Sequence, residues 1–434
     1  MKWGARAARL FLAGALVSPL AGCGTDDDSP GGNTGEPTAY GCIDGHAPLF
    51  DAYAVYWGDL HSHTVYSDDA AAQNPPPEDP AAALAWARDP AGGALDFAAI
   101  TDHAETLTPE EWSSTLDAFH AADSAGFVVF AGFEYTNCSF DPGHGHKCAI
   151  FRDLAHLPAH PTGADSCADP TCLWQTLDAD PGAAYYMTIP HHPSKGVDYG
   201  SNMATDWDAS YVDHERQPLV EIYSVHGCSE ASGCEEPVDH FQDDSTVEEA
   251  LMKWLAAGDA GYKLGIVAST DNHLARPGSV EEIEETVATW EGEYTGGLVA
   301  VWAGALEREA LWEGLQSKRV YGTSGGRIGL EFTAKAGATI VPMGGTLTFD
   351  DSTDVFLHVR ATGEPGVGIR EIQIIRNGEL LVSDETDHLD YRDAGVTANA
   401  YYRVKVYQEA TPVVRVTHCH FERAWSSPIW VERR

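Results

Sequence analysis

The sequence predicts an α/β region followed by an all-β region. Short apolar runs alternate with helix-like stretches up to about residue 323, and strand-like alternation without helices begins at about residue 327. Hydrophobic residues make up 43% of the 434 positions, which is ample for a buried core. Alternating strands and helices are typical of parallel sheets, whereas repeated strands with tight turns are typical of β-sandwiches.

Buried strands of the first region are expected where short apolar runs occur. These runs cover residues 95–100, 126–131, 184–189, 218–223, 264–268 and 297–302. Helix-like stretches lie between several of them, at residues 80–88, 109–122, 246–257 and 306–317. This order predicts parallel strands with crossover helices, in a layer or a barrel, over residues 51–326.

The C-terminal region, residues 327–434, has the period of two that marks half-buried strands. The clearest alternating runs are residues 354–360, 369–375 and 401–407. Asn377 followed by Gly378 is typical of a tight hairpin turn between two strands. We therefore expect an all-β sandwich domain here.

The first residues have the composition of a sorting signal rather than of a fold. Basic residues precede an apolar run at 10–17, which is shorter than the roughly 20 residues that a membrane-spanning helix needs. Residues 20–23, Leu-Ala-Gly-Cys, resemble the lipobox of bacterial lipoproteins, in which Cys23 carries lipid. We expect a signal peptide at 1–22 and a flexible tether at 23–50. The mature protein would be exported and held at the outer membrane or cell surface by acyl chains alone.

The charge balance excludes nucleic acid as a general partner. Lys and Arg number 26 against 66 Asp and Glu, a net charge of −40, whereas phosphate backbones require a basic surface.

An oxidising compartment gives the cysteines a structural role. Nine cysteines are present, and lipidation of Cys23 would leave an even number for disulfides. Proximity in the sequence suggests the pairs Cys138–Cys148, Cys167–Cys172 and Cys228–Cys234, with Cys42 and Cys419 remaining for each other. Zinc binding by four cysteines is the alternative, although no Cys-x-x-Cys occurs.

Histidine and carboxylate residues follow the predicted strands. The strand ends carry His61 and His63, Asp102 and His103, Glu134, His191 and His192, His226, and Asp271 and His273. The carboxyl ends of parallel strands meet on one face, so these side chains are expected in one pocket. Packed together they need cations to satisfy them, which predicts a cluster of divalent metal ions. Residues i and i+2 of a strand share a face, so His61 and His63 can reach one ion.

Several longer motifs surround these strand ends. They include residues 58–64 (Gly-Asp-Leu-His-Ser-His-Thr), 101–103 (Thr-Asp-His), 132–134 (Gly-Phe-Glu), 145–151 (Gly-His-Lys-Cys-Ala-Ile-Phe) and 269–273 (Ser-Thr-Asp-Asn-His). They resemble the PHP (polymerase and histidinol phosphatase) superfamily, and residues 66–70, 221–230 and 319–328 resemble its uncharacterised DUF3604 branch. The resemblance implies a distorted (β/α)7 barrel that holds two or three divalent ions, of zinc, manganese or iron.

The same resemblance implies a ligand set for each ion. The sets for the first, second and third ion are His61, His63 and Asp271; Glu134, His146 and His191; and Asp69, His103 and His273. Glu134 would bridge the first two ions. His192 remains an alternative to His191, and Asp68 remains an alternative to Asp69.

Such a centre predicts a hydrolase. Two ions about 3.5–4 Å apart can activate a shared water and stabilise charge on a phosphate ester. Asp102 and His226 are candidates for protonating the leaving oxygen, and Asp102 alternatively holds a ligand in place. Arg276 would bind a substrate oxyanion or pair with one of the many acids. We expect an extracytoplasmic phosphoesterase acting on a small-molecule ester. The alternatives are a carboxyl or carbamate ester hydrolase and a non-catalytic binding lipoprotein.

Overall fold

The computed structural model describes residues 50, 52–73, 75–137, 144–198, 201–280, 294–409 and 421–434. Residues 43–434 form one compact unit. The predicted signal peptide and most of the tether lie outside the described residues, as do Cys23, Cys42, Cys138 and Cys419. Within the described part of the chain, no helix has both the length and the apolar character needed to cross a membrane.

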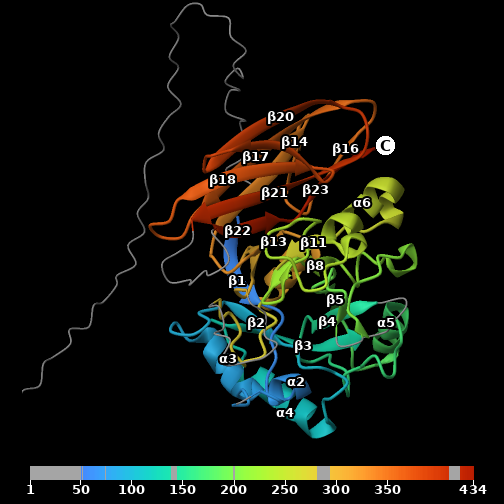
Figure 1. Ribbon diagram of the computed structural model, residues 1–434, viewed down its shortest axis with the longest axis vertical. Helices are drawn as coiled ribbons and strands as arrows, with labels where there is room; N and C mark the ends of the chain where they lie inside the picture. Colours follow the sequence, from blue (N-terminus) through green and yellow to red (C-terminus); the bar gives the residue numbers. More distant parts are fainter. Residues whose placement is uncertain are drawn as a thin grey trace, which may run out of the picture. The chain divides into compact units, whose positions relative to one another are not determined.

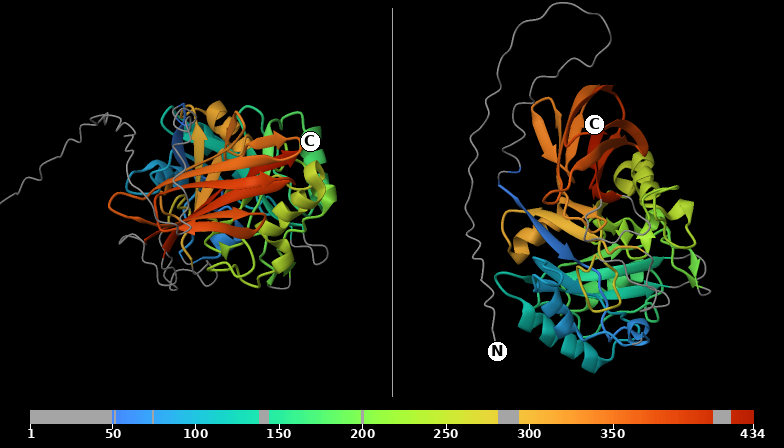
Figure 2. Two further views of the ribbon diagram at one scale, coloured as in Figure 1. Left: turned by 90° about the horizontal axis from the view of Figure 1, so that it is seen from above. Right: turned by 60° about the vertical axis from the view of Figure 1, so that its left-hand side comes forward.

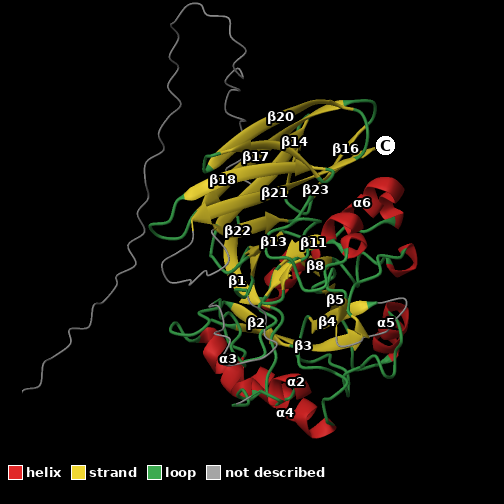
Figure 3. Cartoon of the chain, viewed as in Figure 1, coloured by secondary structure: helices red, strands yellow, loops and turns green. Residues whose placement is uncertain are grey.

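The described chain is a mixed α/β structure whose helices precede residue 320 (Figures 1 and 3). The helices are α2 (Asp68–Ala71), α3 (Pro80–Arg88), α4 (Pro109–Ala122), α5 (Pro170–Ala179), α6 (Val247–Ala257) and α7 (Arg308–Gln316). The strands before residue 324 are β1 (Ala54–Asp59), β2 (Phe97–Ile100), β3 (Val128–Asn137), β4 (Gly145–Phe151), β5 (Tyr186–Pro190), β6 (Val197–Asp198), β7 (Ser201–Asn202), β8 (Leu219–Glu221), β9 (Tyr223–Ser224), β10 (Gly227–Cys228), β11 (Gly265–Val267), β12 (Leu298–Ala303) and β13 (Val320–Thr323). The later strands are β14 (Gly329–Ala336), β15 (Thr339–Pro342), β16 (Thr346–Phe349), β17 (Thr353–Thr362), β18 (Ile369–Arg376), β19 (Glu379–Asp384), β20 (His388–Val396), β21 (Ala400–Glu409), β22 (Phe421–Ser426) and β23 (Ile429–Arg433).

The helices α3, α4 and α5 begin in the same way. Each starts with a proline, and the preceding Asp79, Thr108 or Asp169 accepts a backbone N–H of the first turn. Apolar side chains of α3 and α4 then pack against β2 and β3 in one buried cluster. These helices fix the outer face of strands that carry predicted site residues.

One long sheet runs through most of the chain, in the order β16-β23-β21-β22-β13-β12-β1-β2-β3-β4-β5. The neighbours β1, β2 and β3 are parallel, as are β8 and β11. The expectation of parallel strands throughout is wrong, because β4 runs antiparallel to β3 and β5, and β12 runs antiparallel to β1 and β13. The connection between β3 and β4 is too short for the crossover helix that a parallel pair requires.

The C-terminal region is β-rich, as predicted. The strands β15, β14, β17 and β20 form a separate antiparallel sheet, while β16, β18, β19 and β21–β23 belong to the long sheet. Inward side chains of both sheets, such as Phe332, Leu357 and Val404, share one apolar cluster. The right-hand view in Figure 2 shows these orange and red strands lying together. The hairpin between β18 and β19 turns at Asn377 (φ 51°) and Gly378 (φ 81°), which confirms the predicted turn.

A buried ionic cluster, here the Glu230 cluster, joins the loop after β10 and helix α6 to strands β21 and β22. It consists of Glu230, Glu248, Arg403, Lys405 and Trp425. The Glu230 carboxylate accepts hydrogen bonds from Arg403 (2.5 Å), Lys405 (2.8 Å) and the Trp425 indole (2.9 Å), and Arg403 also pairs with Glu248 at 2.6 Å. Burial opposes ionisation of Glu230, but Lys405 and Arg403 hold its pKa well below the ordinary value.

Among the described cysteines, one of the disulfides suggested by proximity in the sequence is formed. The disulfide Cys167–Cys172 is present, as predicted, with Cα atoms 5.3 Å apart. Cys148, Cys228 and Cys234 are free thiols. The predicted Cys228–Cys234 bond is therefore not formed, although the two thiols lie in hydrogen-bond contact. The predicted partner of Cys148, Cys138, lies outside the described residues. Each thiol contacts another polar group. Cys148 Sγ lies 3.7 Å from Nδ1 of His191, Cys228 Sγ accepts the amide of Glu230 at 3.4 Å, and Cys234 Sγ donates to the carbonyl of Cys228 at 3.2 Å.

Candidate metal centre

The predicted ligands are carried by the segments that follow β1, β2, β5 and β11 and by the strands β3 and β4 themselves. Backbone bridges hold these segments in register: Ser62 pairs with Asn272, and His103 pairs with Glu134. Amides at 61 and 270 also donate to the buried carboxylate of Asp59, at 3.1 Å each. These hydrogen bonds hold the segment after β1 beside the segment after β11, although the two are more than two hundred positions apart in the sequence.

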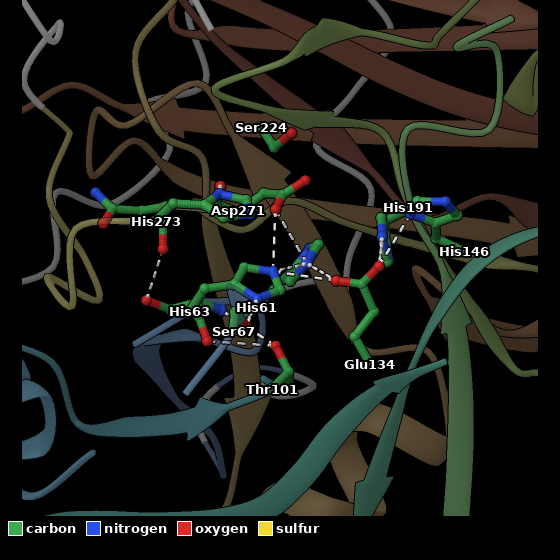
Figure 4. Close-up of polar contacts among 12 residues, drawn as sticks. His61, His63, Ser67, Thr101, Glu134, His146, His191, Ser224, Asp271 and His273 are labelled. Atoms are coloured by element: carbon green, nitrogen blue, oxygen red, sulfur yellow. Dashed lines mark hydrogen bonds and ion pairs between the residues drawn. The ribbon is translucent and has the colours of Figure 1, made fainter. Parts of the chain in front are cut away.

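The first group consists of His61, His63, Glu134 and Asp271, whose side chains converge in Figure 4. The Nε2 atoms of the two histidines lie 3.2 Å apart. Glu134 Oε2 lies 3.3 Å from His61 and 3.0 Å from His63. Asp271 Oδ1 lies 3.1 Å from His61 and 3.4 Å from His63. His61, His63 and Asp271 therefore form one possible ligand group, and Glu134 lies within 3.3 Å of both histidines.

The second group lies on the other side of the same Glu134 carboxylate. The Oε1 atom of Glu134 lies 2.9 Å from Nδ1 of His146 and 3.3 Å from Nε2 of His191. Figure 4 shows the carboxylate between the first group and these two rings. The adjacent His192 is also buried, and its ring packs edge-on against His146 at 4.9 Å between centroids. The structure brings His191 rather than His192 to the shared carboxylate.

The third group is Asp69, His103 and His273. Asp69 Oδ2 lies 2.9 Å from Nε2 of His103 and 3.2 Å from Nε2 of His273. The neighbouring Asp68 is exposed, and its carboxylate accepts the amide of Asp69 at 3.0 Å. Asp69 rather than Asp68 therefore faces the histidines.

The spacing of these donor atoms fits divalent metal ions. Ligands about 2.0–2.1 Å from a tetrahedral ion are roughly 3.3 Å from one another. Separations of 3.0 to 3.4 Å in the first group match that geometry. Among the described residues, Nε2 of His191 and Oδ2 of Asp271 are buried and make no aligned hydrogen bond, so each retains capacity for a further partner. Imidazole and carboxylate donors suit zinc, manganese and iron.

The electrostatics show the same need for positive charge. Burial alone would raise the pKa of the Glu134 and Asp271 carboxyls, but surrounding imidazoles hold both pKa values well below their ordinary range. Burial likewise disfavours charge on His61, yet Asp271 and other neighbours raise its pKa well above 6.5. In the protein alone, protons on imidazole supply the charge that the carboxylates require, and divalent ions would replace those protons.

Most of the predicted histidine ligands are oriented through Nδ1, which leaves Nε2 directed into the centre. The distances from Nδ1 to its partner are 3.2 Å for His61 and Glu221, 2.8 Å for His63 and Ser67, 2.6 Å for His103 and Thr136, 3.7 Å for His191 and Cys148, and 3.1 Å for His273 and the carbonyl of Asp271. A partner that accepts the Nδ1 proton fixes the tautomer and frees the Nε2 lone pair for a metal.

A family model supplies the classification of this chain. The family described as "Protein of unknown function (DUF3604)" matches residues 51–111, 106–258 and 279–386. The chain belongs to the DUF3604 family.

Individual relatives extend the comparison. Uncharacterized proteins of Chlamydia pneumoniae (25% identity, 87% of this chain, 57% of the relative) and Chlamydia muridarum (26% identity, 78% of this chain, 52% of the relative) are similar to this DUF3604 chain. The chain thus spans about half the length of the curated relatives it matches. A solved two-domain structure from Bacteroides vulgatus, described as containing a predicted PHP-like metal-dependent phosphoesterase, is 14% identical, with 86% of this chain and 95% of that one covered and a TM-score of 0.41.

Sequence reasoning missed Glu221 in this DUF3604 site. Its carboxylate orients His61, and burial raises the pKa of that carboxyl. The signal was available, because a histidine or carboxylate at a strand end was the criterion that selected most of the other site residues. The predicted strand at 218–223 was too long: β8 ends at Glu221 itself, so Glu221 occupies the strand end that the prediction gave to His226.

Two site residues have left-handed backbone conformations. Asp271 has φ 53° and His192 has φ 31°. Positive φ is uncommon for residues other than glycine and persists where the surrounding structure holds it. At His192 it allows two consecutive histidine rings to be buried beside the same centre.

The three predicted catalytic residues differ in their surroundings. Asp102 accepts hydrogen bonds from the Thr64 amide (2.6 Å), the Thr64 hydroxyl (2.7 Å) and the Ser67 hydroxyl (2.9 Å), which supports its alternative role of holding a ligand segment. His226 Nε2 lies 3.3 Å from Oδ2 of Asp271, beside the first group. Arg276 is exposed and its guanidinium lies 5.2 Å from the centroid of the Trp86 ring, an arrangement that neither of its predicted roles anticipates.

Proposed function

We propose that this DUF3604 protein is a metal-dependent hydrolase of phosphate esters. The observation that carries the proposal is that the two oxygens of the Glu134 carboxylate face different ligand groups. Oε2 lies beside His61 and His63 of the first group, and Oε1 lies beside His146 and His191 of the second group. A carboxylate shared in this way is suited to bridging two ions about 3.5–4 Å apart. When bound, such ions would acidify a water molecule and offset charge on the ester oxygens.

The chain's own residues would prepare the site for this chemistry. Glu221, Ser67 and Thr136 accept hydrogen bonds from Nδ1 of ligand histidines, so the rings are held in one tautomer before any substrate arrives. Deep burial of His61 and His63 excludes bulk water from the first group. Both features reduce the reorganisation that the reaction requires.

A proton relay lies beside Asp271. Lys195 Nζ lies 3.3 Å from Nδ1 of His226, and the ammonium donates to that nitrogen. Burial and the Lys195 charge hold the pKa of His226 well below its ordinary value, so the ring is neutral with its proton on Nε2. Nε2 of His226, 3.3 Å from Oδ2 of Asp271, would donate its proton to a leaving oxygen at the first group, and Lys195 would add positive charge beside a phosphate held there.

The wider setting is part of the same proposal. We infer a distorted (β/α)7 barrel of the PHP type for the first region and a β-sandwich for the second. We also infer export as a lipoprotein through Cys23, because the basic start, apolar run and Leu-Ala-Gly-Cys sequence occur together. Labelled palmitate in the wild-type protein but not in Cys23→Ser would support the anchor, and equal labelling would exclude it.

The activity test compares aryl phosphate, aryl phosphodiester and aryl carboxyl ester substrates on metal-loaded protein. We expect hydrolysis of at least one phosphate ester by the wild-type protein and none by Glu134→Gln prepared identically. Selective cleavage of the carboxyl ester would favour the alternative hydrolase. With metal demonstrably bound, inactivity on all three substrates would leave a binding role in its place.

A further inference from the structure

A second group of possible metal ligands lies in the β-rich region, on the sheet β15-β14-β17-β20. It consists of His358 on β17 with His388 and Asp390 on β20, here called the His358 group. His358 pairs directly with Asp390 across the two antiparallel strands, and His388 lies two residues before Asp390. All three side chains therefore lie on one face of the sheet. Their neighbours Leu357 and Val359 point the other way, into the apolar core.

From this arrangement we propose that the His358 group is a separate binding site for a divalent transition-metal ion such as Zn²⁺. His388 Nε2 lies 3.4 Å from Nδ1 of His358 and 3.3 Å from Oδ2 of Asp390. These separations match the roughly 3.3 Å between ligands of a tetrahedral ion. The remaining contact, 2.6 Å between His358 Nδ1 and Asp390 Oδ1, is a hydrogen bond whose proton a metal would replace.

The chemistry of the group defines the class of ion. Two imidazoles and one carboxylate are borderline ligands that prefer zinc or copper to magnesium or calcium. His388 is 45% exposed at its side chain and His358 only 12%, so the group is anchored at one end and open to solvent at the other. Three protein ligands with an open side leave room for a fourth ligand from water or from another molecule. Strands β17 and β20 supply the rigidity, because they pair over most of their length.

A neighbouring positive charge should lower the affinity of the His358 group for a cation. Arg360 is exposed and pairs with His388 across the strands, on the same face as the ligands. The positive charge of Arg360 would repel a bound cation, and the Asp390 carboxylate offsets part of that repulsion. Removing Arg360 should therefore strengthen binding at the His358 group without affecting the first, second and third groups of the central cluster.

The test measures zinc stoichiometry of the full chain by equilibrium dialysis in a zinc buffer, followed by elemental analysis. We expect His388→Gln and His358→Gln each to lose about one zinc equivalent per chain relative to wild type. The matched control is His156→Gln. His156 makes a similar surface hydrogen bond to Asp153 (2.7 Å), but among the described residues it belongs to no group of three possible metal ligands. The control variant should lose none.

Two further variants separate this site from the central cluster. The same zinc equivalent should be lost when His388→Gln is placed in a Glu134→Gln background, whatever that background binds. Arg360→Gln should shift half-saturation to lower free zinc. Circular dichroism and thermal melting would establish that each variant is folded. Unchanged zinc content in folded His388→Gln, or loss only when Glu134 is intact, would overturn the proposal.

Discussion

The candidate metal centre and the Glu230 cluster place carboxylates in similar surroundings and satisfy them differently. Glu134 and Glu230 are both almost fully buried. Glu230 is neutralised by Arg403 and Lys405. Glu134 instead faces histidines, and within the described chain its ion pairs are all with imidazoles. One region therefore carries its own permanent cations, whereas the other depends on protons or metal ions.

A buried carboxylate of β22 provides a third case. Glu422 accepts the Ser324 hydroxyl at 2.8 Å and the Gly326 amide at 3.2 Å, and its Oε1 makes no hydrogen bond within the described residues. Burial raises the pKa of this carboxyl to about 7. The charge of the neighbouring Arg423 is too weak to offset burial, so this carboxyl tends to become neutral. The centre around Glu134 is exceptional because imidazoles keep its carboxylate ionised.

The largest effect is expected from Glu134→Gln. The amide cannot bridge two cations, so both adjacent ions should be lost or weakened and hydrolysis should fall roughly 10³-fold or more. Steady-state kinetics and metal content measure the two consequences together. Glu422→Gln is the matched control, since it replaces a buried carboxyl outside the centre. Retention of full activity by Glu134→Gln would contradict the proposed role.

Glu230→Gln should affect stability and leave metal binding intact. Arg403 keeps Glu248 as a partner, but Lys405 loses its buried carboxylate, and breaking a buried ion pair in this way costs about 3–5 kcal/mol of the free energy of unfolding. Chemical denaturation measures this loss. A fall in metal content together with stability would show that the Glu230 cluster and the metal centre are not independent.

Glu422 predicts a pH dependence with a defined sign. Its folded-state pKa of about 7 is above the ordinary value of 4.5, so its stabilising contribution is complete below pH 4.5 and is lost as the pH rises through 7. The shift corresponds to roughly 3–4 kcal/mol at most. The difference in free energy of unfolding between wild type and Glu422→Gln should change over this range; a constant difference from pH 4.5 to 8 would exclude the assignment.

Chelation should destabilise the protein by emptying its proposed metal sites, without acting on the Glu230 cluster. Removal of an ion present at about 100 times its dissociation constant lowers the free energy of unfolding by about 2.7 kcal/mol. Thermal melts with and without chelator should show the same decrease in wild type and in Glu230→Gln, because the two clusters act separately. A decrease that disappears in Glu230→Gln would show that they are coupled.

The smallest effect is expected at Glu221, which orients His61 without belonging to the predicted ligands. Glu221→Gln should weaken metal affinity by roughly 10- to 100-fold while the ion stoichiometry at saturation stays unchanged. Glu105→Gln serves as its control, because this half-buried carboxylate accepts the backbone amides of Thr136 (3.1 Å) and Ala164 (2.6 Å). A complete loss of metal in Glu221→Gln would make Glu221 a ligand rather than an orienting residue.

The sequence predicted the positions of the main elements better than their directions. Apolar runs identified the strands β2, β5 and β12 to within a few residues, because burial imposes that composition. The antiparallel course of β4 was not predicted, since strand direction depends on the length of a connection and on long-range pairing rather than on local composition.

The site was similarly divided between predictable and unpredictable features. Strand-end histidines and carboxylates indicated which side chains would meet, because strand ends converge in such folds. The choice of Asp69 over Asp68 required side-chain geometry, since the two carboxylates are identical in chemistry. The partners of Nδ1, such as Cys148 and Thr136, are ordinary residue types whose role depends on their position alone.

Anomalous X-ray diffraction from crystals of protein purified without chelators tests the central claim most directly. We expect transition-metal peaks on both sides of the Glu134 carboxylate, one within reach of His61, His63 and Asp271 and one within reach of His146 and His191. Well-ordered density for these side chains with no anomalous signal between them would contradict a metal centre at this position.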